Sequence, residues 1–140
     1  MRYYLDTNIL AFVLFDKSLE DNCDNYTCSL LYDYENIFYI SSIAMRELIK
    51  LYNDGELKSA KYKSNKDLFL FISELNYEVK PFTKQHVMTY AELDAMPDHK
   101  DPNDHMIIAQ AVSEKIPIIS SDKKFKLYEK QGLQLVFNKR

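Results

Sequence analysis

The chain has 140 residues, of which 46% are hydrophobic and 28% are charged. This length suits a single domain over residues 1–140. Such a domain can bury a hydrophobic core that is stable without disulfide bonds or structural metal ions. The net charge of −3 argues against a protein that coats nucleic acid through a basic surface, but less against a nuclease whose bound cations supply positive charge. No apolar run approaches the ~20 residues that span a bilayer. The first residues also lack the apolar stretch of a signal peptide, so we expect a cytoplasmic protein.

The two cysteines, Cys23 and Cys28, fit neither a CxxC motif nor a disulfide framework. A single disulfide is not expected in the reducing cytoplasm. We interpret both as small, partly buried hydrophobic residues on one helix.

The first half of the chain alternates short apolar runs with helical patterns. Residues 2–5 predict a buried strand, followed by helical segments at 9–15 and about 21–34. Residues 37–40 predict a second strand, closed by two serines. Either serine can cap a third helix that ends near Tyr52.

The second half continues the alternation. Residues 58–75 are largely helical in pattern, and residues 77–82 predict a short strand. Thr83 caps a helix that continues to about Ala95, and a further helix covers about 101–115. The last two predicted strands are residues 116–120 and 134–137.

Strands separated by helices indicate a parallel sheet with helices on both faces. We therefore expect an α/β fold, a three-layer α/β/α sandwich around a central, mostly parallel sheet of about four to five strands.

Two aspartates follow predicted strands. Asp6 comes directly after residues 2–5, and Asp122 comes just after residues 116–120. Ligands of open parallel sheets bind outside the carboxyl ends of the strands, so both acids are candidates for one site there. The alternative for each is a helix N-cap or a turn acid, which is a common role of aspartate.

A third acid interrupts the apolar face of the helix that ends near residue 52. Glu47 shares this face with Ala44, Leu48 and Leu51. A carboxylate is seldom placed there without a partner or a metal, because burying it unpaired is costly. The alternative is a salt bridge at the edge of the apolar face, with Arg46 or Lys50 as partner.

Asp104 repeats this pattern on the helix over residues 101–115. Its face includes Ile107, Ile108 and Ala111. The alternative is a helix start resembling a capping box, with Asp101 as the N-cap and Asp104 three residues later. That alternative explains Asp101 well and Asp104 only in part. The second residue of a capping box must reach back to the N-cap backbone nitrogen, and the shorter aspartate does this less well than glutamate.

Four converging acids cannot all stay ionised without cations, because like charges raise one another's pKa. Carboxylate oxygens suit Mg²⁺ or Mn²⁺ rather than zinc. Such ions can activate water and stabilise the leaving oxygen in phosphodiester cleavage. The candidate metal-binding and catalytic residues are therefore Asp6, Glu47, Asp104 and Asp122.

The histidines offer no competing site. His86, His99 and His105 are not spaced as a zinc set, and no Ser/His/Asp or Cys/His arrangement is evident. We expect His105 to be an exposed helix residue, with a contact to substrate as the alternative.

Four motifs carry a resemblance to a known family. They are LDTN at 5–8, the segment 41–48 with its glutamate, DPNDHMIIAQA at 101–111, and the strand-then-Asp ending IPIISSDKKF at 116–125. In this order and at these spacings they resemble the PIN-domain nucleases, and specifically the VapC-like toxins of bacterial type II toxin–antitoxin pairs. The resemblance covers essentially the whole chain.

The resemblance implies a metal-dependent endoribonuclease that uses Mg²⁺ or Mn²⁺. It also implies a cognate antitoxin, a homodimer and structured RNA such as tRNA as substrate. The four candidate acids would be metal-site residues on this reading. Support would come from Thr7, Asn8, Ser121 and Asp101.

Two departures from the family pattern concern substrate contacts more than metal binding. His105 stands where the family usually has Arg, and Asn103 where it usually has Phe. The segment 53–67 and its flank are the best candidate for a local basic patch, with a solvated helix face as the alternative. Its lysines are Lys50, Lys58, Lys61, Lys63 and Lys66.

Two other functions compete with a nuclease. An aspartyl-phosphate protein, either a haloacid-dehalogenase-like phosphatase or a receiver domain, also places an aspartate at a strand end. The phosphatase signature wants a second aspartate at the position of Asn8. The other alternative is a non-catalytic PIN scaffold that binds RNA or a protein partner, against which the retention of all four acids argues.

Overall fold

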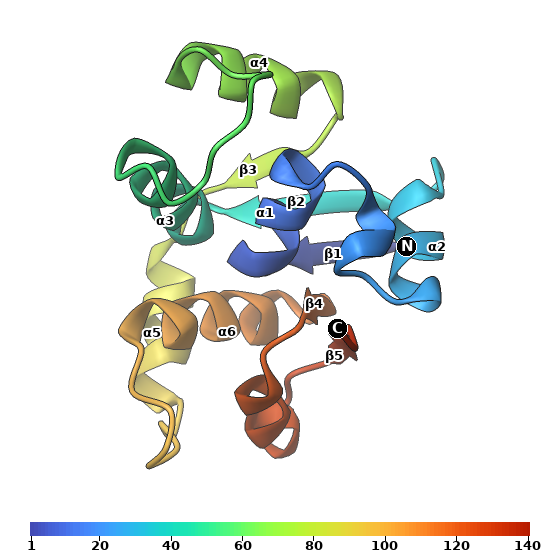
Figure 1. The fold of residues 1–140 in the computed structure, drawn as a ribbon. Coiled ribbons are helices and arrows are strands. Elements are labelled where there is room, and N and C mark those ends of the chain that lie inside the picture. The colour runs from blue at the N-terminus through green and yellow to red at the C-terminus, as the bar shows by residue number, and fades with distance from the viewer.

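Five strands form one sheet, and every neighbouring pair runs parallel, in a computed structural model that describes residues 1–140 (Figure 1). The order across the sheet is β3–β2–β1–β4–β5. This arrangement confirms the expected fold class. The strands are β1 (Arg2–Leu5), β2 (Ile37–Ser41), β3 (Glu78–Lys80), β4 (Ile118–Ser120) and β5 (Leu135–Phe137).

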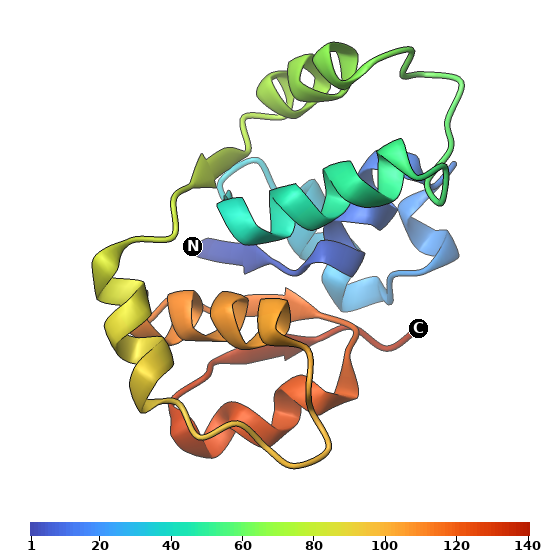
Figure 2. The same ribbon diagram turned by 90° about the vertical axis from the view of Figure 1, so that its left-hand side faces the viewer.

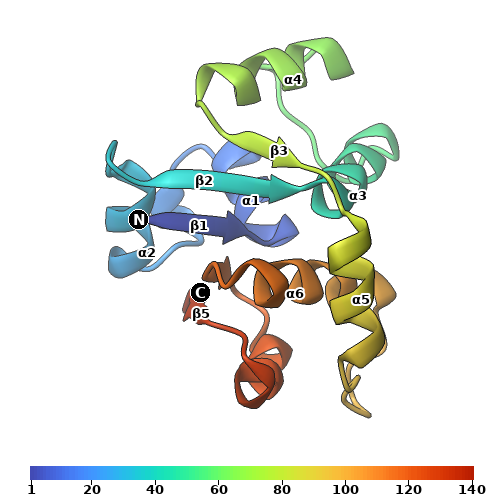
Figure 3. The same cartoon turned by 180° about the vertical axis from the view of Figure 1, so that it is seen from behind.

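Helices cover both faces of the sheet. The α-helices are α1 (Thr7–Phe15), α2 (Asn25–Tyr32), α3 (Ser42–Asn53), α4 (Asn65–Glu74), α5 (Lys84–Glu92) and α6 (Pro102–Glu114), and the 3₁₀ helices are η1 (Leu19–Asp21) and η2 (Lys123–Gln131). Helices α1 and α2 lie in front of the strands in Figure 1 and behind them in Figure 3. Helix α4 stands beyond β3 at one edge of the sheet, as Figure 2 shows from the side. No helix is both long and apolar enough to cross a lipid bilayer.

Two hydrophobic clusters hold the layers together, one for each face. Because side chains alternate along a strand, Tyr3 and Leu5 belong to one cluster and Tyr4 to the other. The smaller cluster joins β1 to Ile9 and Phe12 of α1 and to both cysteines. The larger cluster joins the opposite face to α3, α4, α6 and η2, with α1 also contributing.

Several helix boundaries differ from the sequence-based expectation, because side-chain caps decide where each helix starts. Asp24 accepts a hydrogen bond from the Thr27 backbone nitrogen at 2.7 Å, so α2 begins only at Asn25. Cys23 therefore lies outside the helix that carries Cys28, and the expectation that both share one helix was wrong. Both are buried and unpaired with each other.

The expected helix over residues 58–75 is shorter, because Ser64 caps α4 and residues 58–64 form a loop. In that loop the Tyr62 ring packs against Phe15, Tyr52 and Phe71. Helix α5 also ends at Glu92 rather than near residue 95. The 3₁₀ helix η2 was not anticipated.

The sheet order places a topological switch point between β1 and β4. The chain moves from β1 outward through β2 and β3, then returns to the other side of β1 to form β4. Helices leaving β1 and β4 therefore diverge to opposite sides and leave a crevice at the carboxyl ends of these strands. Asp6 follows β1 there, and Asp122 follows β4.

Candidate metal centre

A pocket of about 290 Å³ opens at this crevice. All four candidate acids line it, although they come from different elements. Thr7, Asn8 and Arg140 also contribute to its wall, whereas Ser121 and Asp101 do not. The full lining consists of Asp6, Thr7, Asn8, Ala11, Phe12, Glu47, Leu51, Asp104, Asp122 and Arg140.

Asp6 lies at the base of the crevice and is 3% exposed. Its Oδ1 accepts a hydrogen bond from the Thr7 backbone nitrogen at 2.8 Å, so it also caps α1. Its Oδ2 accepts a hydrogen bond from the Ser120 hydroxyl at 2.7 Å. Burial raises the pKa of Asp6 to about 7, and the nearby charges of Asp104 and Glu47 act in the same direction, while the two hydrogen bonds oppose them.

The serine that contacts Asp6 is Ser120, the neighbour of the predicted supporting residue Ser121. The Ser120 hydroxyl is fully buried, donates to Asp6 and accepts from the Asp122 backbone nitrogen at 3.0 Å. It therefore connects the two aspartates that follow β1 and β4. The hydroxyl of Ser121 instead accepts a hydrogen bond from Asn138 Nδ2 at 2.8 Å. Asn8 Oδ1 lies 3.5 Å from the Ser121 backbone nitrogen, at the limit of a hydrogen bond.

Glu47 comes to the pocket from α3. Its Oε1 accepts a hydrogen bond from the Thr7 hydroxyl at 2.9 Å, and burial raises its pKa. The alternative of a salt bridge at the edge of the helix face does not hold, because Lys50 pairs with Asp54 at 2.7 Å and Glu47 has no ion-pair partner. Hydrogen bonds from the side chains of Thr7 and Asn103 lower the pKa of Glu47 in part. A carboxylate has about four lone-pair sites, so others remain free at the pocket that Glu47 lines.

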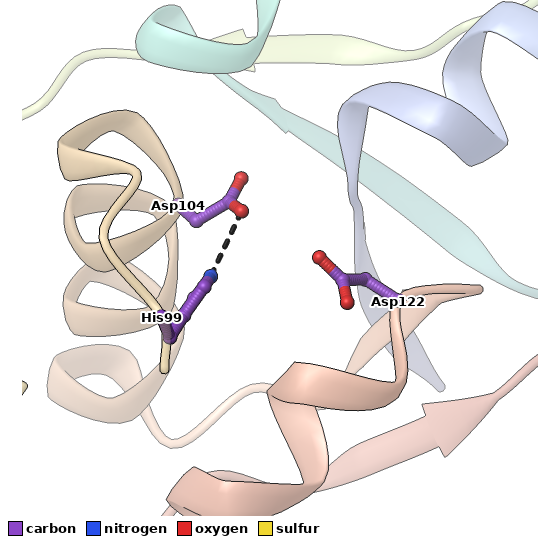
Figure 4. A group of neighbouring side chains, drawn as sticks. All are labelled: His99, Asp104 and Asp122. Carbon is purple, nitrogen blue, oxygen red and sulfur yellow. Dashed lines mark hydrogen bonds and ion pairs between the residues drawn. The ribbon is translucent and has the colours of Figure 1, made fainter. Parts of the chain in front are cut away.

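Asp104 comes from the first turn of α6 and is held by a histidine that the sequence analysis missed. His99 Nε2 lies 2.9 Å from Asp104 Oδ2, and Figure 4 shows the two side chains facing each other. Burial, together with the charges of Asp101, Glu47 and Asp122, raises the pKa of Asp104 to about 7. The capping-box alternative does not apply, because the Asp104 carboxylate bonds to His99.

The tautomer of His99 follows from its neighbour Asp104. An ionised carboxylate can only accept, so the neutral ring carries its proton on Nε2 and donates it to Asp104. His99 Nδ1 then accepts from the Tyr128 hydroxyl at 2.9 Å, and the Tyr128 oxygen accepts from the Met96 backbone nitrogen at 3.1 Å. Burial lowers the pKa of the His99 imidazole, which favours this neutral form.

Asp122 completes the carboxylate set on the side of β4. Its Oδ1 accepts a hydrogen bond from the Lys124 backbone nitrogen at 2.9 Å, so Asp122 also caps η2. Asp6 and Asp122 are therefore both helix N-caps, as the alternative interpretation proposed. Both also line the pocket, so the two roles do not exclude each other. Ligand atoms of His99, Asp104 and Asp122 lie within 4.8 Å of one another, and Figure 4 shows the two carboxylates facing each other.

The chemistry of these donors fits a hard divalent cation. Four carboxylates meet in one pocket, and two of them, Asp6 and Asp104, have pKa values raised to about 7. A bound cation would offset this repulsion and stabilise the ionised forms. The donors are oxygens, and His99 in the tautomer described above is a proton donor, so the set suits a hard divalent cation.

Three further residues lie near the site, and of these only His105 differs from its sequence-based expectation. His105 is buried rather than exposed, and its Nε2 lies 2.7 Å from the His99 carbonyl oxygen, so it supports the loop that carries His99. Asp101 caps α6 through the Asn103 backbone nitrogen at 2.9 Å. Arg140 supplies a positive charge to the pocket wall, with its guanidinium carbon 4.9 Å from the centre of the Phe12 ring.

Comparisons relate the chain to one family by sequence and to solved structures by fold. A family model described as PIN domain matches residues 3–131. The structure of VapBC2 from Rickettsia felis, bound to a DNA fragment from its promoter, is 25% identical, with 98% of both chains covered and a TM-score of 0.73. VapBC-5 from Mycobacterium tuberculosis, a member of the VapBC family of toxin–antitoxin systems, is 18% identical, with 97% of this chain and 98% of that chain covered and a TM-score of 0.61. The PIN domain endonuclease Utp24 is 19% identical, with 99% of this chain and 86% of that chain covered and a TM-score of 0.54. No curated protein matches the sequence.

Proposed function

The chain belongs to the PIN-domain family, and on that premise we propose that it is a metal-dependent endoribonuclease that hydrolyses RNA phosphodiester bonds. The observation that supports this most strongly is the convergence of four carboxylates, from four elements distant in sequence, on one pocket at the switch point of the sheet. A cluster of mutually repelling acids has no structural advantage in a protein that only binds a partner. The endonuclease Utp24, which shares the fold, is consistent with this activity.

In this proposal Asp6, Glu47, Asp104 and Asp122 hold Mg²⁺ or Mn²⁺. The cation supplies the positive charge that activates water and stabilises the leaving oxygen. His99 fixes the orientation of Asp104 through its Nε2 hydrogen bond, and Thr7 does the same for Glu47. Arg140, on the pocket wall, is placed to attract the phosphate that is cut.

Cleavage of purified total tRNA and of an unstructured RNA, with Mg²⁺ or Mn²⁺, tests the proposal. We expect cutting by the native protein that EDTA abolishes and that Asp104→Asn lowers at least 100-fold, as expected for loss of a metal ligand. Asp98→Asn is the matched control, because Asp98 is an exposed acid outside the pocket. No cutting of any RNA by folded, metal-loaded protein would favour the scaffold that binds without cutting.

We further propose that the protein acts in the cytoplasm as the toxin of a toxin–antitoxin pair, with an antitoxin protein as partner, tRNA as a candidate substrate and a homodimer as its working state. Support comes from the structural similarity to VapBC assemblies. Expression of the native protein should arrest growth, and Asp6→Asn should remove the arrest. Growth arrest that persists with Asp6→Asn at equal protein levels would contradict a toxicity based on catalysis.

A further inference from the structure

A second hollow adjoins the pocket on the side of η2 and β5. It has a volume of about 530 Å³ and is lined by Ser121, Lys123, Lys126, Phe137, Lys139 and Arg140. We call it the η2–β5 cleft. Arg140 lines both hollows, so the cleft begins where the carboxylate pocket ends. Ser121 and Lys123 flank Asp122 in the chain, which ties the cleft to the same edge of the sheet.

The four cations of this cleft form no ion pairs, although the charge of Lys139 acts on Asp24 and Arg140 also borders the carboxylate pocket. Lys123, Lys126, Lys139 and Arg140 are exposed, and none of them takes part in any of the ion pairs of the structure. The sequence from residue 123 onward contains six lysines or arginines and only one acid, Glu129, in a chain whose net charge is −3. This segment of the chain therefore carries net positive charge and borders a pocket of four acids. Four neighbouring cations repel one another unless a polyanion neutralises them.

The cleft also presents an aromatic ring. Phe137 forms part of its lining, and the Lys126 ammonium lies 4.0 Å from the centre of that ring. Arg140 lies over Phe12 in the same way, at 4.9 Å. Cations combined with aromatic rings are the pattern by which proteins bind single-stranded nucleic acid, because lysines contact phosphates and bases stack on aromatic faces. A duplex leaves no free base face for Phe137.

We propose that the η2–β5 cleft binds the single-stranded RNA segment next to the phosphate that is cut. This inference rests on the proposed nuclease function. It places the RNA strand along a path from the carboxylate pocket past Arg140 towards Lys126. The cleft also accounts for how an acidic protein attracts a polyanion. The pocket alone, with its four carboxylates, repels RNA until a cation is bound.

The lysines of the segment 53–67 are a poorer candidate for this role. Lys61 lines a hollow that also contains Asp67 and Glu74, and Lys50 is already paired with Asp54. The Lys63 backbone nitrogen donates to Asp67 Oδ2 at 3.0 Å, which brings another acid to the same segment. Charges of both signs therefore alternate there, as on an ordinary solvated surface.

The proposal is tested by measuring the affinity for a fluorescein-labelled single-stranded RNA of about 12 nucleotides by fluorescence anisotropy. The measurement is repeated from about 50 to about 300 mM KCl, because the salt dependence of the affinity reports the number of phosphate contacts. All proteins carry Asp104→Asn and are measured in EDTA, so that the RNA stays intact. Lys123→Gln with Lys126→Gln should weaken binding roughly 10-fold at about 0.1 M salt and lower the slope of log K against log salt by about 1.4, the value for two phosphate contacts. Lys61→Gln with Lys63→Gln is the matched control and should change the affinity less than about twofold.

Unchanged RNA affinity in the Lys123→Gln, Lys126→Gln protein would overturn the proposal. It would do so even if the same variant lost affinity for an acidic protein partner. Loss of affinity in the control would also overturn it and would favour the segment 53–67. Because all four lysines are exposed, equal melting temperatures of both proteins should verify that folding is unaffected. RNA binding and RNA cleavage are measured separately, so the two proposals can fail independently. If only the nuclease proposal is wrong, the native protein will not cleave RNA, but the cleft variant will still bind RNA more weakly than the control.

Discussion

His99 donates a hydrogen bond from Nε2 to the Asp104 carboxylate at 2.9 Å, and its Nδ1 accepts from the Tyr128 hydroxyl at 2.9 Å. The three residues come from the loop before α6, from α6 itself and from η2. The orientation of the Asp104 carboxylate thus depends on a buried chain of hydrogen bonds that reaches away from the pocket. Groups that orient a metal-binding carboxylate in this way are part of the site, although they touch neither cation nor substrate.

Replacement of His99 should therefore lower metal affinity without abolishing folding. We expect His99→Ala to weaken Mn²⁺ binding and cleavage by roughly 10-fold to 100-fold, the range found for partners that orient metal ligands. In His99→Gln the side-chain amide can still donate to Asp104, so this variant should recover part of the loss. Mn²⁺ titration and cleavage rates measure both effects. Equal losses in the two variants would contradict a role based on the hydrogen bond.

Ser120 should control the protonation of Asp6. Its hydrogen bond to Asp6 lowers the pKa of that carboxyl group, so Ser120→Ala should raise the pKa and shift the pH profile of cleavage to higher pH. The variant also leaves the Asp122 backbone nitrogen without its acceptor, which should cost roughly 1–3 kcal/mol of stability. Ser121→Ala is the control, because the Ser121 hydroxyl bonds to Asn138. A profile that moves as far in Ser121→Ala as in Ser120→Ala would contradict this assignment.

The raised pKa of Asp104 makes the metal-free protein sensitive to pH. The carboxyl group has a pKa of about 7 in the folded chain and an ordinary value of 3.8. Between these values the folded state holds a proton that the unfolded state has released, so its contribution to stability falls as pH rises from about 4 to about 7 and then stays constant.

Asp104→Asn removes this titration. In EDTA the melting temperature of the variant should equal that of the native protein near pH 4 and exceed it by roughly 10 °C near pH 8. This follows from about 1.4 kcal/mol for each pH unit of the shift and about 2–4 °C for each kcal/mol. Thermal melts followed by circular dichroism across this range measure the difference. A difference that shrinks as pH rises would contradict the raised pKa. Added Mn²⁺ should narrow the difference, because it stabilises the native protein more than the variant.

The sequence located the acids because each obeys a local rule. Asp6 and Asp122 follow short apolar runs that predict buried strands, and parallel strands bring both to one edge of the sheet. Glu47 was recognised because it interrupts an apolar helix face, where an unpaired charge is costly. The fold class followed from the alternation of strands and helices, which confines the chain to a parallel sheet between layers of helices.

The supporting residues depend on contacts that no local pattern encodes. Ser120 faces Asp6 because Leu5 pairs with Ile119, and this register is set by the packing of the whole sheet. His99 lies in a loop between α5 and α6, where periodicity gives no signal. His105 was misjudged as exposed because the polar side of α6 is covered by the loop that its Nε2 holds. Arg140 reaches the pocket from beyond β5, far along the chain from Asp6, Glu47 and Asp104.

Titration of the metal-free protein with Mn²⁺ by calorimetry tests most directly whether the four acids form a metal centre. We expect saturable binding by the native protein, with affinity at least 10-fold weaker in Asp6→Asn and in Asp104→Asn and unchanged in Asp98→Asn, because only the first two lose a ligand in the pocket. No Mn²⁺ uptake by folded native protein, or equal uptake by all four proteins, would contradict the metal centre and with it the proposed nuclease.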